Sequence, residues 1–155
     1  MRTPEEYMAL ALELAGEAAA EGEVPVGCVI AGPDGTVIGT GRNRRENGSD
    51  ATAHAEMEAI RSACAALGSW RLTDCSLYVT LEPCPMCAGA VINARVSRLY
   101  YGAREPHSGC CGSVLNLFME PFGFEPRIEG GIRGNECTAL LRRFFESRRS
   151  GEAST

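Results

Sequence analysis

The order of apolar and polar positions predicts a helix and then two strands at the start of the chain. Apolar residues recur at helical spacing over residues 4–22, and Pro4 is a residue type that suits the first helical position. Two apolar stretches, residues 24–30 and 36–41, flank the segment Gly-Pro-Asp-Gly at residues 32–35. Because these four residue types favour turns, the pattern predicts an antiparallel hairpin.

The middle of the chain alternates between helical and strand patterns. Residues 53–67 are rich in alanine, have apolar positions at helical spacing and end at Gly68. Residues 76–81 form a nearly continuous apolar run, which is typical of a strand buried on both faces. A helix over residues 85–94 and a strand over residues 96–102 follow. A strand, a helix and a strand in this order predict a right-handed parallel crossover.

Beyond residue 102 the apolar pattern is weaker. We expect an irregular stretch over residues 103–113, a short helix near residues 114–119 and a weak strand near Arg127. A last helix is predicted from about residue 135 to residue 149, which leaves residues 150–155 as a short disordered tail.

Length and composition are those of one folded domain. The chain has 155 residues, of which 45% are hydrophobic and 23% charged, and we find no repeat or linker. We therefore expect a single α/β layered domain with a mixed sheet over residues 1–155. The first ten residues include two glutamates and no long apolar run. This predicts a protein of the cytoplasm, with neither a signal peptide nor a membrane span.

Cysteines and arginines limit the possible partners. In a reducing compartment the eight cysteines are expected to be metal ligands, small buried residues or reactive thiols and not disulfides. The net charge of −5 opposes wholesale electrostatic capture of nucleic acid, but all fifteen basic residues are arginine. An arginine cluster fits either phosphate binding or a solvated surface. The arginines gather at Arg42, Arg44, Arg45, Arg142, Arg143, Arg148 and Arg149.

The segment TLEPCPMC places Cys84 and Cys87 three residues apart, directly after the buried strand. Pro83 and Pro85 frame Cys84, so the chain is expected to enter a helix at once with both thiols in its first turn. A helix N-terminus favours thiolate over thiol and so favours metal binding. By itself the pair also fits a redox pair, half of a structural zinc site or two packed cysteines.

The segment TAHAE adds His54 and Glu56 at the start of the preceding helix. Residues two apart do not share a helix face, so two different roles are expected. His54 with the two cysteines gives three nitrogen and sulfur ligands that suit zinc and leave a fourth position for water. Glu56 can then stand beside that water. A structural site is the alternative, in which a further thiol completes the set, such as Cys28, Cys110 or Cys111.

H-x-E followed by P-C-x-x-C is the signature of zinc-dependent nucleobase deaminases. The chain resembles bacterial tRNA-specific adenosine deaminases in the order and spacing of EVPVGCVI, GRNR, TAHAEMEAIR, LYVTLEPCPMCAGAVINARV, YGARE and ECTALLRRFFESRR. The resemblance covers residues 5–149. It implies the cytidine-deaminase-like three-layer α/β/α fold with a five-stranded mixed sheet, a homodimer and one zinc ion per subunit. It also implies hydrolytic conversion of the wobble adenosine of a tRNA anticodon, expected in an arginine tRNA, to inosine.

The resemblance assigns roles residue by residue. His54, Cys84 and Cys87 match the zinc ligands, and Glu56 matches the residue that transfers protons between water and the base. Asn43 matches an asparagine that hydrogen-bonds the flipped base, because an amide can both donate and accept at a purine edge. A turn asparagine after a strand is the other interpretation of Asn43.

Further residues match the family's substrate contacts, namely Val26, Glu82, Ala103, Arg104, Glu105, Phe144, Phe145 and Arg148. Read alone, Val26 is a strand valine and Glu82 is equally a buried structural carboxylate. At least one of the adjacent phenylalanines of the last helix is expected to face inward. Aromatic rings beside arginines suit the stacked bases and phosphates of a tRNA anticodon stem-loop.

The chain departs from the family pattern at three positions. Ala51 stands where the family usually has proline, Glu105 where aspartate is common and His107 where lysine is common. The last two changes predict altered sugar and phosphate contacts in the loop near the target base. Two other functions remain open, a deaminase of free bases or nucleosides such as guanine or cytosine, and a non-catalytic RNA-binding protein stabilised by zinc.

Overall fold

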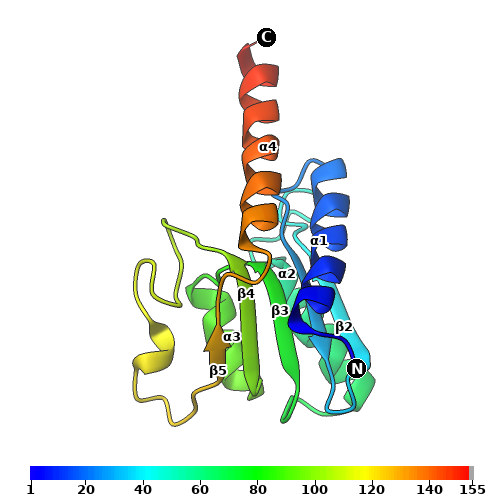
Figure 1. The fold of residues 1–155 in the computed structure, drawn as a ribbon, viewed down its shortest axis with the longest axis vertical. Coiled ribbons are helices and arrows are strands. Elements are labelled where there is room, and N and C mark those ends of the chain that lie inside the picture. The colour runs from blue at the N-terminus through cyan, green and yellow to red at the C-terminus, as the bar shows by residue number, and fades with distance from the viewer. Residues whose placement is uncertain (154–155) are drawn as a thin grey trace.

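The computed structural model describes residues 1–153 and shows a sheet of five strands between two layers of helices (Figure 1). The strands are β1 (Gly27–Ala31), β2 (Val37–Arg42), β3 (Ser76–Leu81), β4 (Arg98–Ala103) and β5 (Arg127–Glu129). The helices are α1 (Pro4–Ala20), α2 (Ala55–Leu67), α3 (Pro85–Ala94) and α4 (Gly134–Ala153), with a short 3₁₀ helix η1 (Leu117–Met119). No described helix is both long and apolar enough to span a bilayer.

The sheet is mixed, with the strand order β2-β1-β3-β4-β5. β1 pairs antiparallel with β2 and β3, whereas β4 pairs parallel with β3 and β5. The parallel pairing of β3 with β4 confirms the crossover predicted through α3. Parallel strands end at the same edge of a sheet, so the chain leaves β3 and β4 beside each other at one edge.

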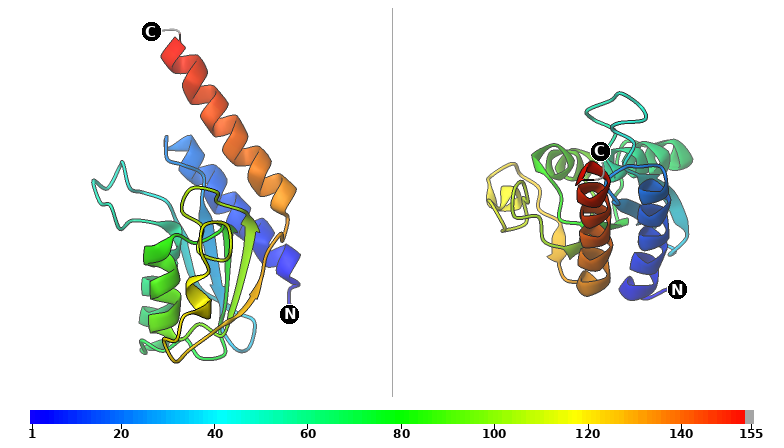
Figure 2. Two further views of the ribbon diagram at one scale, coloured as in Figure 1. Left: turned by 90° about the vertical axis from the view of Figure 1, so that its left-hand side faces the viewer. Right: turned by 90° about the horizontal axis from the view of Figure 1, so that it is seen from above.

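Side chains of β1 alternate between two cores. Cys28 and Ile30 pack with buried residues of α2 and α3, whereas Val29 and Ala31 pack with buried residues of α1. Figure 2 shows the same division, with α1 and α4 on one face of the sheet and α2 and α3 on the other. The predicted three-layer α/β/α fold is therefore confirmed.

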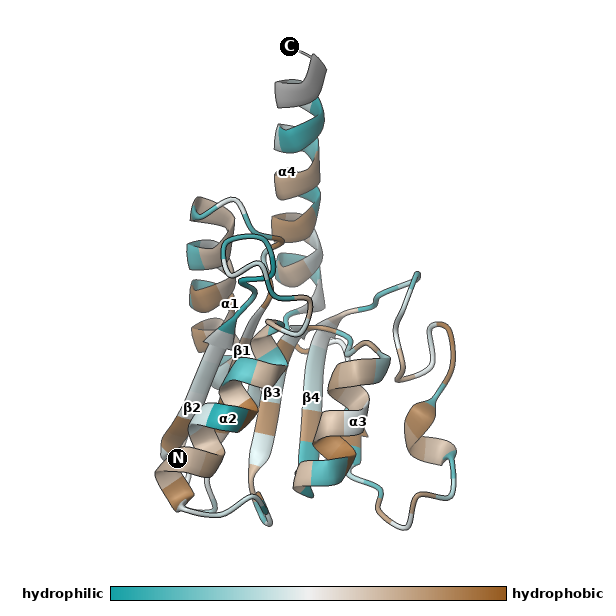
Figure 3. Cartoon of the chain, turned by 180° about the vertical axis from the view of Figure 1, so that it is seen from behind, coloured by the Kyte–Doolittle hydropathy of each residue, from teal (hydrophilic) through white to brown (hydrophobic). Residues whose placement is uncertain are grey.

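The helices differ in how much of their surface meets the sheet. Figure 3 shows hydrophilic residues on the outer side of α2 and along the far part of α4. α4 extends beyond the edge of the sheet at which β3 and β4 end (Figure 1). At the other extreme, α1 lies so close to β1 that a Cβ atom at Gly27 would collide with the backbone oxygen of Ala11. Glycine at position 27 thus permits this close packing.

Several element boundaries differ from the prediction, most clearly those of β1, α2 and α4. β1 begins at Gly27 and not at residue 24, because the Val26 N–H donates to the Val24 carbonyl at 2.9 Å and forms a tight turn. α2 begins at Ala55. α4 continues to Ala153, four residues beyond the end predicted at residue 149. No proline follows Arg149, and one glycine is not enough to end a helix. Residues 154–155 lie outside the described part of the chain.

Candidate active site

The predicted metal ligands meet where two helices begin. His54 is the N-cap residue of α2, Cys84 is the N-cap residue of α3, and Cys87 lies in the first turn of α3. The Nδ1 atom of His54 lies 3.5 Å from the Sγ atom of each cysteine. Although His54 is 30 residues from Cys84, the packing of α2 beside α3 brings the three side chains together.

The spacing of these atoms fits a tetrahedral zinc ion. Zn–S bonds of about 2.3 Å and Zn–N bonds of about 2.0 Å at a tetrahedral angle require S···N separations of about 3.5 Å. The ligand atoms of the three residues all lie within 4.8 Å of one another. Among the described residues, Cys28, Cys110 and Cys111 do not belong to this group. The structural alternative with a fourth protein ligand therefore finds no support, and the arrangement has the open position typical of catalytic zinc.

The two cysteines differ in their acid–base properties. A hydrogen bond with Cys87 is the largest cause that lowers the pKa of Cys84, to about 4, and a hydrogen bond with His54 contributes against the opposing effect of burial. The same bond with Cys84 and burial raise the pKa of Cys87. The pair therefore readily supplies one thiolate, and a cation between the sulfurs would favour the second.

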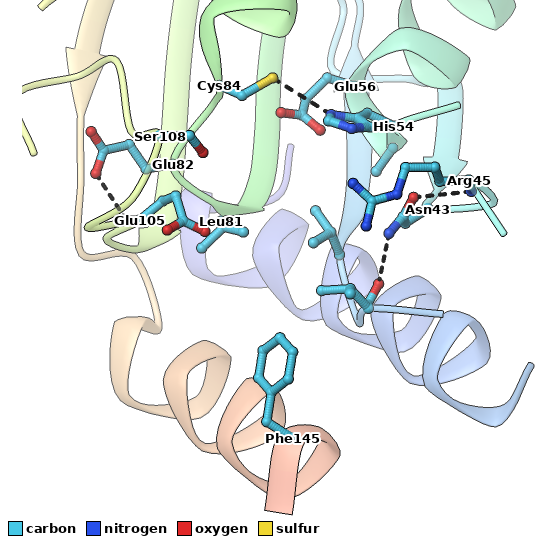
Figure 4. A pocket seen from close by; sticks show the side chains of 13 residues that line it. Asn43, Arg45, His54, Glu56, Leu81, Glu82, Cys84, Glu105, Ser108 and Phe145 are labelled. Carbon is cyan, nitrogen blue, oxygen red and sulfur yellow. Dashed lines mark hydrogen bonds between the residues drawn. The ribbon is translucent and has the colours of Figure 1, made fainter. Parts of the chain in front are cut away.

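Glu56 is the second residue of α2, and its side chain is only 4% exposed. Figure 4 shows its carboxylate beside His54 and Cys84. Burial is the main cause that raises the pKa of Glu56 to about 7, and the negative charge of Cys84 adds to it. A carboxyl group with a pKa near neutrality can both accept and release a proton.

A pocket of about 220 Å³ opens in front of Glu56 (Figure 4). It is lined by Val24, Val26, Asn43, Arg45, His54, Ala55, Glu56, Leu81, Glu82, Cys84, Glu105, Ser108 and Phe145. Val26 and Asn43, which the resemblance matches to substrate contacts, both line this pocket, although Val26 precedes β1 and is not a strand residue. The lining thus combines apolar side chains with polar and charged ones, and both kinds occur in small-molecule sites.

Asn43 follows the end of β2 and is 8% exposed. Its Oδ1 atom accepts a hydrogen bond from the Arg45 N–H at 3.2 Å, and its Nδ2 atom donates to the Val24 carbonyl at 3.4 Å. The first bond is the turn-forming bond expected of an asparagine after a strand. The structure therefore confirms the turn interpretation, and each amide atom retains capacity for a second hydrogen bond.

Glu82 follows β3 and holds the loop on the opposite side of the pocket. Its carboxylate accepts hydrogen bonds from the backbone N–H groups of Glu105 (3.1 Å), Cys111 (2.8 Å) and Ser113 (3.1 Å), and from the Ser113 hydroxyl. A Cβ atom at Gly109 would collide with this carboxylate. Glu82 lines the pocket and at the same time acts as a buried structural carboxylate.

A second pocket of about 450 Å³ adjoins the first one and shares Val24, Leu81, Glu105 and Phe145 with it. Arg104 and His107 line only the second pocket. The Glu105 carboxylate accepts a hydrogen bond from the His107 N–H at 2.9 Å. The two departures from the family pattern in this loop are therefore neighbours in space.

Three residues matched to substrate contacts line neither pocket. Ala103 is buried at the end of β4, and its carbonyl accepts the Glu82 N–H at 2.8 Å. Phe144 packs edge-on against Phe145 and is the more buried of the two rings. Arg148 lies over Phe144 and donates to the Gly22 carbonyl at 2.6 Å. These contacts tie α4 to the segment after α1 and position Phe145 at the pocket.

Arg45 and Glu23 are two of the residues at the site that the sequence analysis did not assign to it. Arg45 appeared only as one member of an arginine cluster, yet it lines the pocket. Glu23 was not singled out, yet it is 1% exposed and its carboxylate accepts the N–H groups of Glu46 (3.0 Å) and Asn47 (2.7 Å). The signal for Glu23 was a single acidic residue directly before an apolar run, which is too common a pattern to be informative.

Comparisons with known proteins extend this description. The chain is 46% identical over 148 residues to the tRNA(Ile)-lysidine synthase of Deinococcus radiodurans, but it spans only 25% of the length of that relative. It is 44% identical over 150 residues to the tRNA-specific adenosine deaminase of Bacillus subtilis, with 96% of this chain and 92% of that one covered.

Solved structures of deaminases also match this chain. A structure from studies of A-to-I editing by tRNA:A34 deaminases at the wobble position of transfer RNA matches with a TM-score of 0.83 and 44% identity, covering 87% of this chain and 98% of that one. A guanine deaminase from Nitrosomonas europaea matches with a TM-score of 0.82 and 28% identity, covering 93% and 85%. Residues 1–103, which include all three metal ligands, match the family model of the cytidine and deoxycytidylate deaminase zinc-binding region. The chain belongs to this family of zinc-binding deaminases.

Proposed function

We propose that the protein hydrolytically deaminates adenosine to inosine at the wobble position of a tRNA anticodon. The observation that carries the proposal is the position of the buried Glu56 carboxylate beside the three ligands at the inner end of the pocket. Zinc held by His54, Cys84 and Cys87 would supply a Lewis acid that lowers the pKa of water in the site. The similarity to tRNA-specific adenosine deaminases supports adenosine in tRNA as the substrate.

Glu56 transfers the protons of the proposed reaction. Its carboxylate accepts a proton from the attacking water and delivers it to N1 of adenine while the oxygen adds to C6. It then carries a second proton from that oxygen to the leaving amino group, which departs as ammonia. Glu56 ends as a carboxylate, ready for the next cycle.

Asn43 and Val26 position the base. The free amide hydrogen and the free oxygen lone pair of Asn43 can pair with one edge of the purine. Val26 is buried at the pocket wall and offers an apolar contact to the flat face of the ring. Both residues lie within the part of the pocket that also contains Glu56, so a base held by them presents its amino carbon to the reacting groups.

The expected partner is the anticodon stem-loop of a tRNA. The second pocket extends from the first past Phe145, so nucleotides that flank the reactive adenosine have room beside it. Aromatic rings suit stacking with unpaired bases. We further propose that the protein acts in the cytoplasm as one domain per subunit of a homodimer. Exposed apolar residues around η1 support an interface there, namely Val114, Leu115, Met119 and Phe122.

Incubation with an unmodified tRNA whose anticodon begins with adenosine tests the proposal, with an arginine tRNA as the first choice. Inosine at that position is the expected product, and a folded, zinc-loaded enzyme that leaves the adenosine intact would refute the proposal. The structural likeness to a guanine deaminase makes a free-base deaminase the second candidate. Ammonia release from free guanine or cytosine, together with no reaction on tRNA, would favour it.

A further inference from the structure

The first arginine cluster contains two paired side chains and one unpaired side chain. Arg42 forms ion pairs with Glu17 (3.2 Å) and Glu21 (2.6 Å) of the α1 region. Arg44 forms an ion pair with Glu58 of α2 at 2.9 Å. Arg45 has no carboxylate partner and no side-chain hydrogen bond within the part of the chain that the structure describes. The positive charge of Arg45 is therefore the one in this cluster that is available to a ligand.

Arg45 also has the position that a ligand contact requires. Among the described residues it is the only arginine that lines the first pocket, and Figure 4 shows its guanidinium group projecting into the pocket near His54. Glu56 and Asn43 are 4% and 8% exposed, whereas Arg45 is exposed. The proton-transfer group and the base contact thus lie deep in the pocket, and the cation lies at its rim.

The backbone of Arg45 is held on both sides although its side chain is free. Its N–H donates to Asn43 Oδ1 at 3.2 Å, and its carbonyl accepts the Asp50 N–H at 3.1 Å. The next two residues donate their N–H groups to the buried carboxylate of Glu23. A loop held in this way places the guanidinium group at the rim before any ligand arrives, which reduces the entropic cost of binding.

We infer that Arg45 binds a backbone phosphate that flanks the reactive adenosine, an inference that rests on the proposed function. A nucleotide whose base has been flipped into a pocket leaves its phosphates at the mouth, where Arg45 lies. A guanidinium group donates two parallel hydrogen bonds to phosphate oxygens, and its charge adds to their strength. Arg45 thereby selects a polynucleotide over a free base, which carries no phosphate.

The salt dependence of RNA binding tests this inference without turnover. The probe is a fluorescent anticodon stem-loop RNA, bound to zinc-loaded wild type, Arg45→Gln, Arg45→Lys and Arg127→Gln over a range of NaCl concentrations. Arg127→Gln is the matched control because it removes the same charge from an exposed residue of β5, at the opposite end of the sheet from the pocket. We expect Arg45→Gln to raise Kd about tenfold and to reduce the slope of log Kd against log salt by about 0.7 to 0.9. Arg45→Lys keeps the slope, and Arg127→Gln changes neither value.

A chemical double-mutant cycle locates the phosphate. The same RNA is made with one neutral methylphosphonate linkage, either 5′ or 3′ of the adenosine. We expect one of the two methylphosphonate linkages to weaken RNA binding by wild type about as much as Arg45→Gln does. The same linkage should not weaken RNA binding by Arg45→Gln any further. The inference would be overturned if Arg45→Gln and Arg127→Gln had the same Kd and the same salt dependence. It would also be overturned if, at both linkages, the methylphosphonate changed the Kd of wild type and of Arg45→Gln equally.

The failure of this inference can be separated from the failure of the proposed function. A wild type that forms inosine while Arg45→Gln behaves like Arg127→Gln refutes the phosphate contact alone. A wild type that shows the coupling to one linkage but forms no inosine refutes the proposed reaction alone. A wild type that does not bind the RNA refutes both.

Discussion

Glu23 and Glu82 are buried carboxylates that hold opposite sides of the same pocket. Glu23 accepts backbone N–H groups of the loop after β2, which carries Asn43 and Arg45. Glu82 accepts backbone N–H groups of the loop after β4, which carries Glu105. The exposed fractions of the two carboxylate residues are 1% and 2%. Because each one satisfies several backbone donors of one loop, the pocket has two walls that are positioned by separate anchors.

Glu82→Gln is expected to destabilise the protein by about 1–3 kcal/mol at neutral pH, because an amide cannot accept all the N–H donors that face a carboxylate. Burial alone would raise the pKa of Glu82, but the hydrogen bonds from Ser113, Cys111 and Glu105 lower it below the usual 4.5. A lowered pKa means that the charged form stabilises the fold above the unfolded-state pKa. This stabilisation is lost as the pH falls through the folded-state pKa.

The difference in unfolding free energy between wild type and Glu82→Gln should therefore shrink as the pH falls from about 5 to about 3. Urea denaturation at several pH values measures it. Glu13→Gln, an exposed change on α1, serves as the control and should show no such trend. A difference that stays constant over this range would contradict the role given to the Glu82 charge.

Glu23→Gln is expected to loosen the loop after β2 while the metal ligands stay in place. Hydrogen exchange at the amides of Glu46 and Asn47 should become faster, because both amides donate to Glu23. On an anticodon stem-loop, KM should rise about 5- to 30-fold with a smaller change in kcat, since the loop carries Asn43 and Arg45, which we propose contact the substrate. Unchanged exchange at both amides, in a variant with normal zinc content, would argue against the anchoring role.

Cys87→Ser is expected to lower zinc affinity by more than about 100-fold, because it replaces a buried sulfur ligand. Metal analysis of wild type should give one zinc per chain, and the variant should lose its zinc on dialysis. Since zinc binds the folded state, a chelator should lower the Tm of wild type but not that of the variant. Cys64→Ser is the matched control, because Cys64 lies outside the ligand group. A variant that retains a full zinc complement would show that Cys87 is not a ligand.

Glu56→Gln is expected to lower the rate of inosine formation by a factor of about 10² to 10⁴, the usual contribution of a positioned acid–base group. Glutamine has the same shape, so zinc content and RNA affinity should stay close to those of wild type. Single-turnover assays, metal analysis and RNA titration measure the three quantities. If RNA affinity fell by the same factor as the rate of inosine formation, Glu56 would act in binding. An unchanged rate would show that Glu56 takes no part in the reaction.

The amino-acid sequence by itself determined the order of the elements and the ligand set. Apolar periodicity is a local property, so it predicted α2, β3, α3 and the parallel β4 without knowledge of their packing. The motif around Cys84 and Cys87 is also local, because two prolines and a three-residue spacing are enough to place both thiols where a helix begins. The ends of the elements were predicted less accurately than their order, as β1 and α4 show. A single hydrogen bond or one helical turn decides where an element ends.

Only the tertiary structure decided which charged residues serve the site. Arg42, Arg44 and Arg45 are neighbours in the sequence with the same side chain, and their difference arises from carboxylates on α1 and α2 that pair with the first two. Glu23 and Glu82 acquired their roles in the same way, from loops that the packing of the sheet brings to them. Ion pairs and buried hydrogen bonds depend on distances between residues far apart in the chain, and these distances exist only after the helices have packed on the sheet.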